Sequence, residues 1–377
     1  MLLERLQVAD FRNLEAVSLR PSPHATVVVG ANGQGKTSLL EAVYFLATLR
    51  PLRANRLSEL VRFGTERSSV TGRFTLGGAE REISVQVSAG LRQAFVDGKK
   101  AAKLEDYFGG VSVVAFTPDD LAVVKGGPDL RRAFLDRAVF NRFPAYLREH
   151  RAYQRALKSR NRLLKEHAPA SYVEAYDEAV ARTGARVLVR RHALLDELAP
   201  KAVAAVRAIS QLPDVGVGYA ALHLGAQHPR TEEADLEHVL RNALTERLGR
   251  DRERGFTSVG PHADDLQLTL GGRSARAYAS QGQGRALVLG WKIAEIENVR
   301  SAFGRPPLLL LDDVSSELDP DRNAFLMHTV AESHAQVLLT TTDAMLVARA
   351  AGPDTLWLRV DAGTVTEDAR LRPARTG

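Results

Sequence analysis

Short apolar runs and longer helix-forming segments alternate at both ends of the chain. Residues 26–29 form a β-branched run that enters Gly30, and residues 37–49 hold many helix formers and no breaker. Near the other end, residues 282–303 fit a long helix and four leucines at 308–311 fit a buried strand. Such alternation is typical of a mostly parallel α/β sheet. Further strands are predicted at 69–76, 82–87, 111–116, 266–270, 337–340 and 355–360, and a helix at 322–333.

The middle of the chain has a different pattern. Helix formers dominate from about residue 119 to 248, and Pro144, Pro169 and Pro200 are among the residues expected to break the helices. This pattern predicts a mainly α-helical inserted domain. The predicted organisation is an α/β domain made of residues 1–119 and 256–377, interrupted by an insert at 120–255.

Composition narrows the possible classes of protein. A chain of 377 residues is long enough for two domains, and the absence of cysteine excludes disulfides, thiolate zinc sites and thiol nucleophiles. The first nineteen residues carry Glu4, Arg5 and Asp10 within their apolar pattern, which is neither a secretory signal nor a membrane span. We therefore expect a cytoplasmic protein with no membrane partner.

Positive charge is concentrated in one segment. The formal net charge is +6, but residues 125–165 hold twelve Lys and Arg against three acids, a local net charge of +9, so the rest of the chain sums to −3. On a helix spanning residues 145–165, the cations recur at spacings of 3, 4, 3 and 4 and form one stripe. The stripe comprises Arg148, Arg151, Arg155, Lys158 and Arg162, and the opposite side carries Tyr146, Tyr153, Leu157 and Leu164.

This stripe has two interpretations. Cations on one helix face can follow the phosphates of DNA. The alternative is a solvated face whose cations pair with local acids, of which only Glu149 and Glu166 are near in sequence. DNA contact is the favoured interpretation.

The strongest chemical signal is GANGQGKTS at residues 30–38, a Gly-x4-Gly-Lys-Thr motif between a predicted strand and a predicted helix. In such a loop the backbone N–H groups surround the phosphates, Lys36 neutralises the β and γ oxygens, and the Thr37 hydroxyl ligates Mg²⁺. The predicted nucleotide-binding residues are Gly30, Ala31, Asn32, Gly33, Gln34, Gly35, Lys36, Thr37 and Ser38.

A second motif, LLLLDDVSSELDPDR, begins at Leu308. The Asp312 carboxylate, at the carboxyl end of the predicted strand, is expected to hold the Mg²⁺ of Thr37 through water. Asp313 is expected to orient or deprotonate the attacking water and, with Lys36, to form the catalytic pair. The alternative is that the two acids only cap the end of a strand.

Residues 279–291, ASQGQGRALVLGW, place two glycines at the entrance of the long predicted helix, where bare backbone favours an anion. With the Gly-Lys-Thr loop and the acidic strand end, this order of motifs resembles the ABC-type ATPases. The resemblance implies that the signature motif Ser280, Gln281, Gly282 and Gln283 faces the nucleotide of a second protomer, so that ATP drives homodimerisation. It also implies a D-loop at Ser316 and Asp319.

Within that superfamily the chain resembles the RecF family of bacterial recombination mediators. The likeness implies an ABC-type P-loop ATPase head that binds DNA at single-strand/double-strand junctions. It further implies weak, DNA-stimulated ATP hydrolysis as a release switch, and work with RecO and RecR to load RecA on gapped DNA during recombinational repair and the SOS response to DNA damage. Contact of Arg12 and Asn13 with the nucleotide rests on the likeness alone, and the alternative is that they form a β-turn that leaves the first strand. The stretches that carry the likeness are FRNLE (11–15), FTPDDLAVVKGGPDLRRAFLD (116–136), RGFTSVGPHADD (254–265), YASQGQGR (278–285) and LLLLDDVSSELD (308–319), together with the Gly-Lys-Thr loop.

The active-site motifs depart from those of the transporters in the superfamily. Asp313 stands where transporters have Glu, which shortens the side chain by about 1.5 Å. Thr341, Thr342 and Asp343 follow a strand after which a transporter would have a histidine for the γ-phosphate. A misplaced base and a missing electrostatic donor each lower the rate by orders of magnitude. We therefore expect turnover below several per second.

Two other functions share the nucleotide motifs. The ATPase subunit of a membrane transporter is disfavoured by the 244-residue separation of Lys36 from Ser280 and by the basic insert. A structural-maintenance (SMC-type) tether would need far longer heptad arms, although a short-armed tether differs from a local clamp only in reach. The turn at His262, Asp264 and Asp265 could suggest a metal site, but a structural role is favoured.

Overall fold

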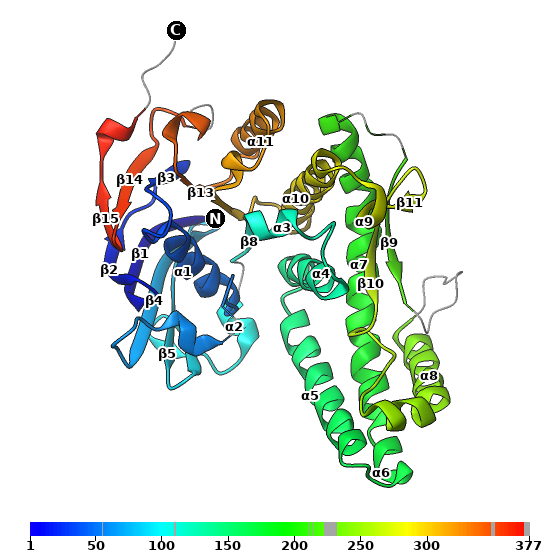
Figure 1. Cartoon of the computed structure of the whole chain (residues 1–377). Coiled ribbons are helices and arrows are strands. Elements are labelled where there is room, and N and C mark those ends of the chain that lie inside the picture. The colour runs from blue at the N-terminus through cyan, green and yellow to red at the C-terminus, as the bar shows by residue number, and fades with distance from the viewer. Residues whose placement is uncertain are drawn as a thin grey trace. The chain divides into compact units, whose positions relative to one another are not determined.

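The computed structural model describes residues 1–54, 56–108, 111–210, 212, 214–221, 232–347 and 351–372. The chain forms two compact units (Figure 1). The first unit combines Met1–Leu121 with Val299–Gly377, and the second unit is Ala122–Asn298.

A six-stranded, mostly parallel sheet supports the first unit. Its order is β15-β14-β3-β13-β12-β8, in which β15 alone runs antiparallel to its neighbour. Every residue of its three central strands, β3, β13 and β12, is buried, which explains why these strands are continuous apolar runs. The predicted α/β sheet built from both ends of the chain is confirmed. The strands are β3 (Ala25–Val29), β8 (Val113–Phe116), β12 (Leu308–Asp312), β13 (Val337–Thr341), β14 (Leu356–Asp361) and β15 (Thr364–Glu367).

The first unit also contains an antiparallel sheet, which the sequence pattern predicts only in part. Its order is β2-β1-β4-β5-β6-β7. The strands predicted at 69–76 and 82–87 belong to this sheet, whereas the sequence pattern does not predict β2, β6 or β7. The strands are β1 (Leu2–Phe11), β2 (Leu14–Leu19), β4 (Arg67–Leu76), β5 (Ala79–Ser88), β6 (Leu91–Val96) and β7 (Lys99–Lys100).

Helix α1 (Lys36–Thr48) contacts strands of both sheets of the first unit. Eleven of its thirteen residues are buried, as expected for a helix that is apolar all round. It begins directly after the Gly-Lys-Thr loop, so the phosphate-binding segment is fixed to a buried element. The remaining helices of this unit are η1 (Leu57–Leu60), α2 (Leu104–Phe108), α3 (Pro118–Leu121), η2 (Val314–Ser316), α11 (Pro320–Glu332), η3 (Ala344–Val347) and η4 (Ala369–Leu371).

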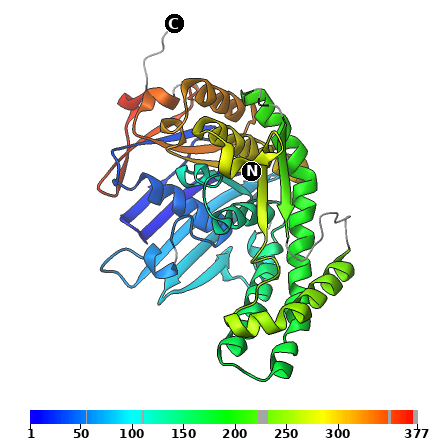
Figure 2. The same cartoon turned by 45° about the vertical axis from the view of Figure 1, so that its right-hand side comes forward.

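The second unit is mainly helical, and its long helices α5, α7 and α8 are visible in Figure 2. Helix α7 packs against both α5 and α8, and Ala185, Leu188 and Leu236 form a buried apolar cluster there. A small antiparallel sheet, β11-β10-β9, completes the unit. Its elements are α4 (Pro128–Arg142), α5 (Tyr146–Lys165), α6 (Ala170–Glu174), α7 (Asp177–Ser210), β9 (Val215–Ala220), α8 (Glu233–Arg254), β10 (Asp265–Leu270), β11 (Arg273–Ser274), α9 (Ala275–Tyr278) and α10 (Gln281–Phe303), which ends in the first unit.

Two expectations about the insert differ from the structure. Pro200 does not end a helix, because α7 continues through it for a total of 34 residues. Leu198 before the proline and Val206 after it are both buried, so packing on both sides offsets the lost backbone hydrogen bond. The second unit also extends beyond the predicted end at residue 255, to Asn298, because β10 pairs with β9 of the insert.

Candidate nucleotide-binding site

The Gly-Lys-Thr loop connects β3 to α1, as predicted. Gly33 and Gly35 have φ angles of 82° and 118°, a region that side chains disfavour. A Cβ atom on Gly35 would also lie 2.9 Å from the Asn13 amide. These two glycines therefore allow the tight turn that precedes the helix.

Lys36 lies in the first turn of α1, with its ammonium group against the loop. Its Nζ donates hydrogen bonds to the carbonyl oxygens of Gly30, at 2.7 Å, and Ala31, at 3.0 Å. Burial lowers the pKa of Lys36, while the nearby carboxylates of Asp313 and Asp312 act in the opposite direction. The ammonium group of Lys36 is thus held against the loop, near the carboxylates of Asp312 and Asp313.

Asp312 is the centre of a polar cluster at the carboxyl end of β12. The Thr37 hydroxyl donates to its carboxylate, with Oγ1 to Oδ1 and Oδ2 distances of 2.8 and 3.1 Å, and the Thr340 hydroxyl donates at 2.9 Å. The guanidinium of Arg53 lies 3.1 Å from Oδ2. The structure therefore brings together Thr37 and Asp312, the two residues predicted to serve Mg²⁺. It adds Arg53, which no feature of the sequence singles out.

Asp313 follows in a strained backbone conformation. Its φ of 49° is in the left-handed region, and its N–H donates to Thr340 Oγ1 at 2.9 Å. Non-glycine residues in this region cost about 1–3 kcal/mol and are concentrated at functional sites. Burial raises the pKa of the Asp313 carboxyl, although Lys36 opposes the shift. Within the described residues, its buried Oδ1 has no hydrogen-bond partner.

Arg12 and Asn13 form the turn of the β1–β2 hairpin. Arg12 Nε donates to Glu41 Oε2 at 2.8 Å. Asn13 bridges the Gly-Lys-Thr loop, because it accepts a bond from the Ser38 hydroxyl at 2.7 Å and donates to the Gln34 carbonyl at 3.1 Å. The hairpin-turn role is therefore visible in the structure, and nucleotide contact remains a prediction.

Glu41, on α1, is a buried carboxylate that sequence reasoning missed. Besides the Arg12 guanidinium, it accepts hydrogen bonds from the backbone N–H groups of Leu52 and Arg53, at 3.0 and 2.9 Å. One carboxylate thus positions two arginines from separate segments. A single acid inside an apolar helix was the only signal in the sequence.

These groups line one cleft of about 650 Å³ in the first unit. Gly30, Ala31 and Gln34 are not among its lining residues. Gln34 instead contacts the β14–β15 turn, where it accepts hydrogen bonds from the N–H groups of Gly363 and Ala362. The cleft is lined by Arg12, Asn13, Asn32, Gly33, Gly35, Lys36, Thr37, Ser38, Arg53, Glu59, Val61, Phe63, Pro118, Asp312 and Asp313.

The oxygen donors in the cleft fit Mg²⁺. A hydroxyl and a carboxylate within 2.8 Å of each other supply the hard ligands that this ion prefers. In the part of the chain that the structure describes, no group of three His, Asp or Glu side chains could hold a metal alone. A magnesium ion here would therefore rest on Thr37, Asp312 and the phosphates themselves.

The predicted signature motif begins helix α10 in the second unit. Ser280 and Gln283 form a capping box: Ser280 N–H donates to Gln283 Oε1 at 2.8 Å, and Gln283 N–H donates to Ser280 Oγ at 3.2 Å. Ser280 and Gln281 are exposed, whereas Gly284 is buried. The tip of this helix is therefore accessible, while its first turn is fixed by its own side chains.

The predicted D-loop residues lie immediately after β12. Ser316 Oγ donates to the Asp313 carbonyl at 2.8 Å. Asp319 caps α11, where it accepts a bond from the Arg322 N–H at 3.1 Å. Both residues thus have local structural roles, which leave their predicted contact with a second protomer untested.

Comparison with known proteins supports one family. A model of the RecF/RecN/SMC N-terminal domain matches residues 2–360. A protein of Myxococcus xanthus named DNA replication and repair protein RecF is 66% identical over 99% of both chains. A protein of the same name from Anaeromyxobacter dehalogenans is 56% identical over 97% of this chain and 99% of its own. The chain belongs to the RecF family of DNA replication and repair proteins.

Solved structures agree with this assignment. A RecF structure described as the ATP complex in the RecFOR pathway matches with a TM-score of 0.85 and 30% identity, over 98% of both chains. An SMC head bound to a winged-helix domain of ScpA matches with a TM-score of 0.56 at 15% identity, over 98% of this chain and 97% of that one. This second likeness shows the fold alone. The predicted α/β ATPase head with a helical insert is confirmed. Membership of the RecF family supports neither of the two alternative functions, the ATPase subunit of a membrane transporter and the SMC-type tether.

The basic stripe of this RecF-family chain lies on α5, as predicted. Tyr146, Tyr153 and Leu164 are buried on the opposite side, so the amphipathic helix is confirmed. Arg148, Arg155, Lys158 and Arg162 are exposed, and Arg151 is half-buried. Arg162 lies 4.0 Å from Glu166, and Glu149 pairs with Arg190 of α7. DNA contact remains a prediction.

Another arginine of α5 has a different role. Arg160 is fully buried and donates to Asp177 at 2.7 Å and to Asp251 at 2.8 Å. It therefore ties α5 to α7 and α8. Arg160 lies three residues after Leu157 and four before Leu164, so the helical period places it on the apolar side, away from Lys158 and Arg162, which are exposed.

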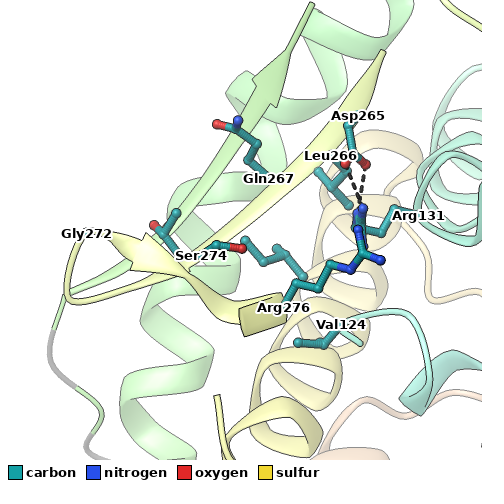
Figure 3. Close-up of a pocket in the computed structure, with 10 residues that line it drawn as sticks. Val124, Arg131, Asp265, Leu266, Gln267, Gly272, Ser274 and Arg276 are labelled. Carbon is teal, nitrogen blue, oxygen red and sulfur yellow. Dashed lines mark hydrogen bonds and ion pairs between the residues drawn. The ribbon is translucent and has the colours of Figure 1, made fainter. Parts of the chain in front are cut away.

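The turn at residues 262–265 has the structural role that was favoured. The His262 ring contacts the Tyr153 hydroxyl at 2.5 Å, and Asp264 accepts a bond from Tyr219 at 2.9 Å. Burial raises the pKa of Asp264 to about 7, although Tyr219 acts to lower it. Asp265 forms a two-bond ion pair with Arg131, which Figure 3 shows at the edge of a cavity of about 390 Å³ in the second unit.

Within the described residues, no helix is long and apolar enough to cross a membrane.

Proposed function

We propose that this RecF-family protein is an ATP-dependent DNA-binding switch of recombinational repair. One observation carries the proposal: the Thr37 hydroxyl lies 2.8 Å from Asp312, beside a lysine held at the mouth of a Gly-rich loop. This arrangement has the parts needed to hold Mg²⁺ and a nucleoside triphosphate. The relative solved with ATP makes ATP the proposed nucleotide.

The residues of the cleft have separate roles in this proposal. The loop N–H groups and Lys36 bind the phosphates, and Thr37 with Asp312 would hold Mg²⁺, which neutralises charge that develops on the phosphate oxygens. Asp313 accepts a proton from, or orients, the attacking water. Its raised pKa makes it a better proton acceptor.

We propose that the exposed Ser280 tip binds the γ-phosphate held by a second copy of the chain. Helix N-termini favour anions, and the first backbone N–H groups of an α-helix, apart from one that Ser280 already caps here, have no partner within the helix. ATP would then link two copies into a homodimer, and slow hydrolysis would release it.

The proposed ligand of the dimer is DNA at a single-strand/double-strand junction, which the α5 stripe would contact. The proposed location of the protein is the cytoplasm. The two solved RecF relatives are described as proteins of the RecFOR pathway. By this likeness we propose RecO and RecR as partners in loading RecA, and stimulation of the weak ATPase by DNA.

The test is sedimentation of the wild type and Ser280→Arg with ATP and Mg²⁺, with and without a gapped duplex. We expect ATP-dependent dimers of the wild type and monomers of the variant, which still binds ATP. Ser274→Arg is the matched control, since Ser274 is also exposed but lies on β11, outside the motif. Dimers of both Ser280 forms, or of neither, would contradict the composite site.

A further inference from the structure

Phe63 is the most exposed large apolar side chain in the described part of the chain, with a relative exposure of 102%, compared with 72% for Leu91. It also lines the cleft that contains Lys36 and Asp312. Water contact with a whole phenyl ring is unfavourable, so an aromatic ring presented at the wall of a ligand cleft indicates a flat, apolar contact there.

Backbone hydrogen bonds hold the turn that carries this ring in place. Phe63 is the second residue of a β-turn in which Thr65 N–H donates to the Arg62 carbonyl at 3.1 Å. Gly64, the third residue, has a φ of 86°, which a type II turn requires. Arg62 N–H in turn donates to the Asp10 carbonyl at 2.9 Å, so the turn is anchored to strand β1.

Side chains and a second backbone contact also anchor the turn. The Thr65 hydroxyl donates to the Arg62 carbonyl at 2.9 Å, and the Arg62 guanidinium donates to Glu15 at 2.9 Å. Just before the turn, Val61 forms a β-bridge with Phe11. The ring is therefore exposed at the tip of a fixed turn, which lowers the entropy cost of stacking a planar ligand on it.

The lining of the cleft divides by chemistry. Lys36, Thr37 and Asp312 provide the groups that bind phosphate and metal, whereas Val61 and Phe63 provide an apolar wall. A nucleotide has the same division, because its triphosphate is anionic and its base is a flat aromatic ring.

From this match we propose that Phe63 is the platform on which the base of the nucleotide stacks. The proposal rests on the proposed function, since it assigns the base end of the same cleft. Stacking on a phenyl face does not depend on hydrogen-bond readout, because every base has a π-face. The platform therefore favours a nucleoside triphosphate over an inorganic chain of phosphates and contributes equally to ATP and GTP.

The experiment compares ATP, GTP and inorganic tripolyphosphate, each with Mg²⁺, by calorimetric titration of the wild type and Phe63→Ala. We expect the variant to bind ATP and GTP about tenfold more weakly, equivalent to about 1.4 kcal/mol, and to bind tripolyphosphate as the wild type does. Phe63→Tyr keeps the ring and should restore ATP affinity. Leu91→Ala is the control, because Leu91 is exposed on β6 and does not line the cleft.

Three results would overturn the base platform. They are unchanged ATP affinity in Phe63→Ala, equal weakening of ATP and tripolyphosphate, and loss of dimers with intact nucleotide affinity. The first excludes the contact, the second indicates a disturbed turn, and the third assigns the ring to an interface between copies. Failure of the proposed function is a separate result, in which wild-type protein binds neither ATP nor tripolyphosphate.

Discussion

The cleft of the first unit and helix α5 of the second unit both gather charged side chains, but in different environments. In the cleft, Asp312 has contacts with two hydroxyls and a guanidinium within about 3.1 Å. On the outer face of α5, Arg155 and Lys158 have no carboxylate partner among the described residues. A charged side chain held by several partners has a fixed position, whereas exposed charges without partners contribute mainly to the electrostatic potential at the surface.

The same contrast occurs within α5 itself. Arg160 is fully buried and pairs with the carboxylates of Asp177 and Asp251. Lys158 and Arg162, two residues before and after it on the same helix, are exposed to solvent. Substitutions on the two faces of one helix therefore separate a structural charge from charges proposed to bind DNA. The predictions below run from the largest expected effect to the smallest.

The largest effect is expected from Arg160→Ala. The substitution leaves Asp177 and Asp251 buried without their cation, which typically costs about 3–5 kcal/mol of the free energy of unfolding. Urea denaturation followed by Trp291 fluorescence measures it in the second unit, in a Trp357→Phe background that removes the chain's other tryptophan. Arg155→Ala, on the same helix but exposed, should change stability by less than about 0.5 kcal/mol. Equal losses in the two variants would remove the distinction between the faces.

Asp313→Asn tests the cleft. Asparagine has the same size and tolerates a left-handed φ, so the backbone at residue 313 should be kept. Loss of the proton acceptor should lower ATP turnover about 100-fold while ATP affinity stays within about threefold. Asp321→Asn, an exposed acid of α11 outside the cleft, is the control. A variant with full turnover would show that Asp313 only caps the strand.

Wild-type turnover is part of the same test. We expect fewer than several ATP molecules hydrolysed per second without a partner, because the acid is short and residues 341–343 lack a histidine. A coupled phosphate-release assay measures this rate. A faster rate would mean that another group supplies the missing stabilisation.

Much of the cleft could be predicted from sequence because its main motifs are contiguous. Gly33, Gly35, Lys36 and Thr37 act through the local turn in which they lie, so their spacing is enough to place them. Glu41 and Arg53 act through contacts made by chain folding, and a lone acid or arginine has no period that reveals such contacts.

The insert shows the same limit. The stripe on α5 was predictable from spacing, because the burial of Tyr146, Tyr153 and Leu164 follows the helical period. The same period places Arg160 on the buried side, but its partners were not predictable, since these carboxylates are 17 and 91 residues away in the sequence. Pro200 misled the prediction because tertiary packing outweighed its local preference.

Per pH unit, a smaller effect is expected from Asp264→Asn, measured as the pH dependence of stability. The folded pKa of Asp264, about 7, is above the ordinary value of 3.8, so this group stabilises the protein below pH 4. That contribution is lost as pH rises towards 7, by up to about 1.4 kcal/mol per pH unit. The variant should remove this part of the slope while its amide oxygen still accepts the Tyr219 hydrogen bond. Urea midpoints between pH 4.5 and 8 measure the difference, and parallel curves would contradict the assignment.

The smallest effect is expected on the outer face of α5. Replacing Arg148, Arg151 and Arg155 by alanine should weaken binding of a gapped duplex about tenfold at 0.1 M salt and leave ATP affinity unchanged. The slope of log affinity against log salt should fall in magnitude by up to about 0.9 for each phosphate that the variant no longer neutralises, so the two proteins should converge at high salt. Arg182, Arg186 and Arg241, exposed arginines of α7 and α8 that each pair with a carboxylate, give a matched triple-alanine control. If the stripe positions phosphates, the result should depend on which three arginines are removed. Equally weak DNA binding by both triple variants would therefore show that net charge, and not the stripe, attracts DNA.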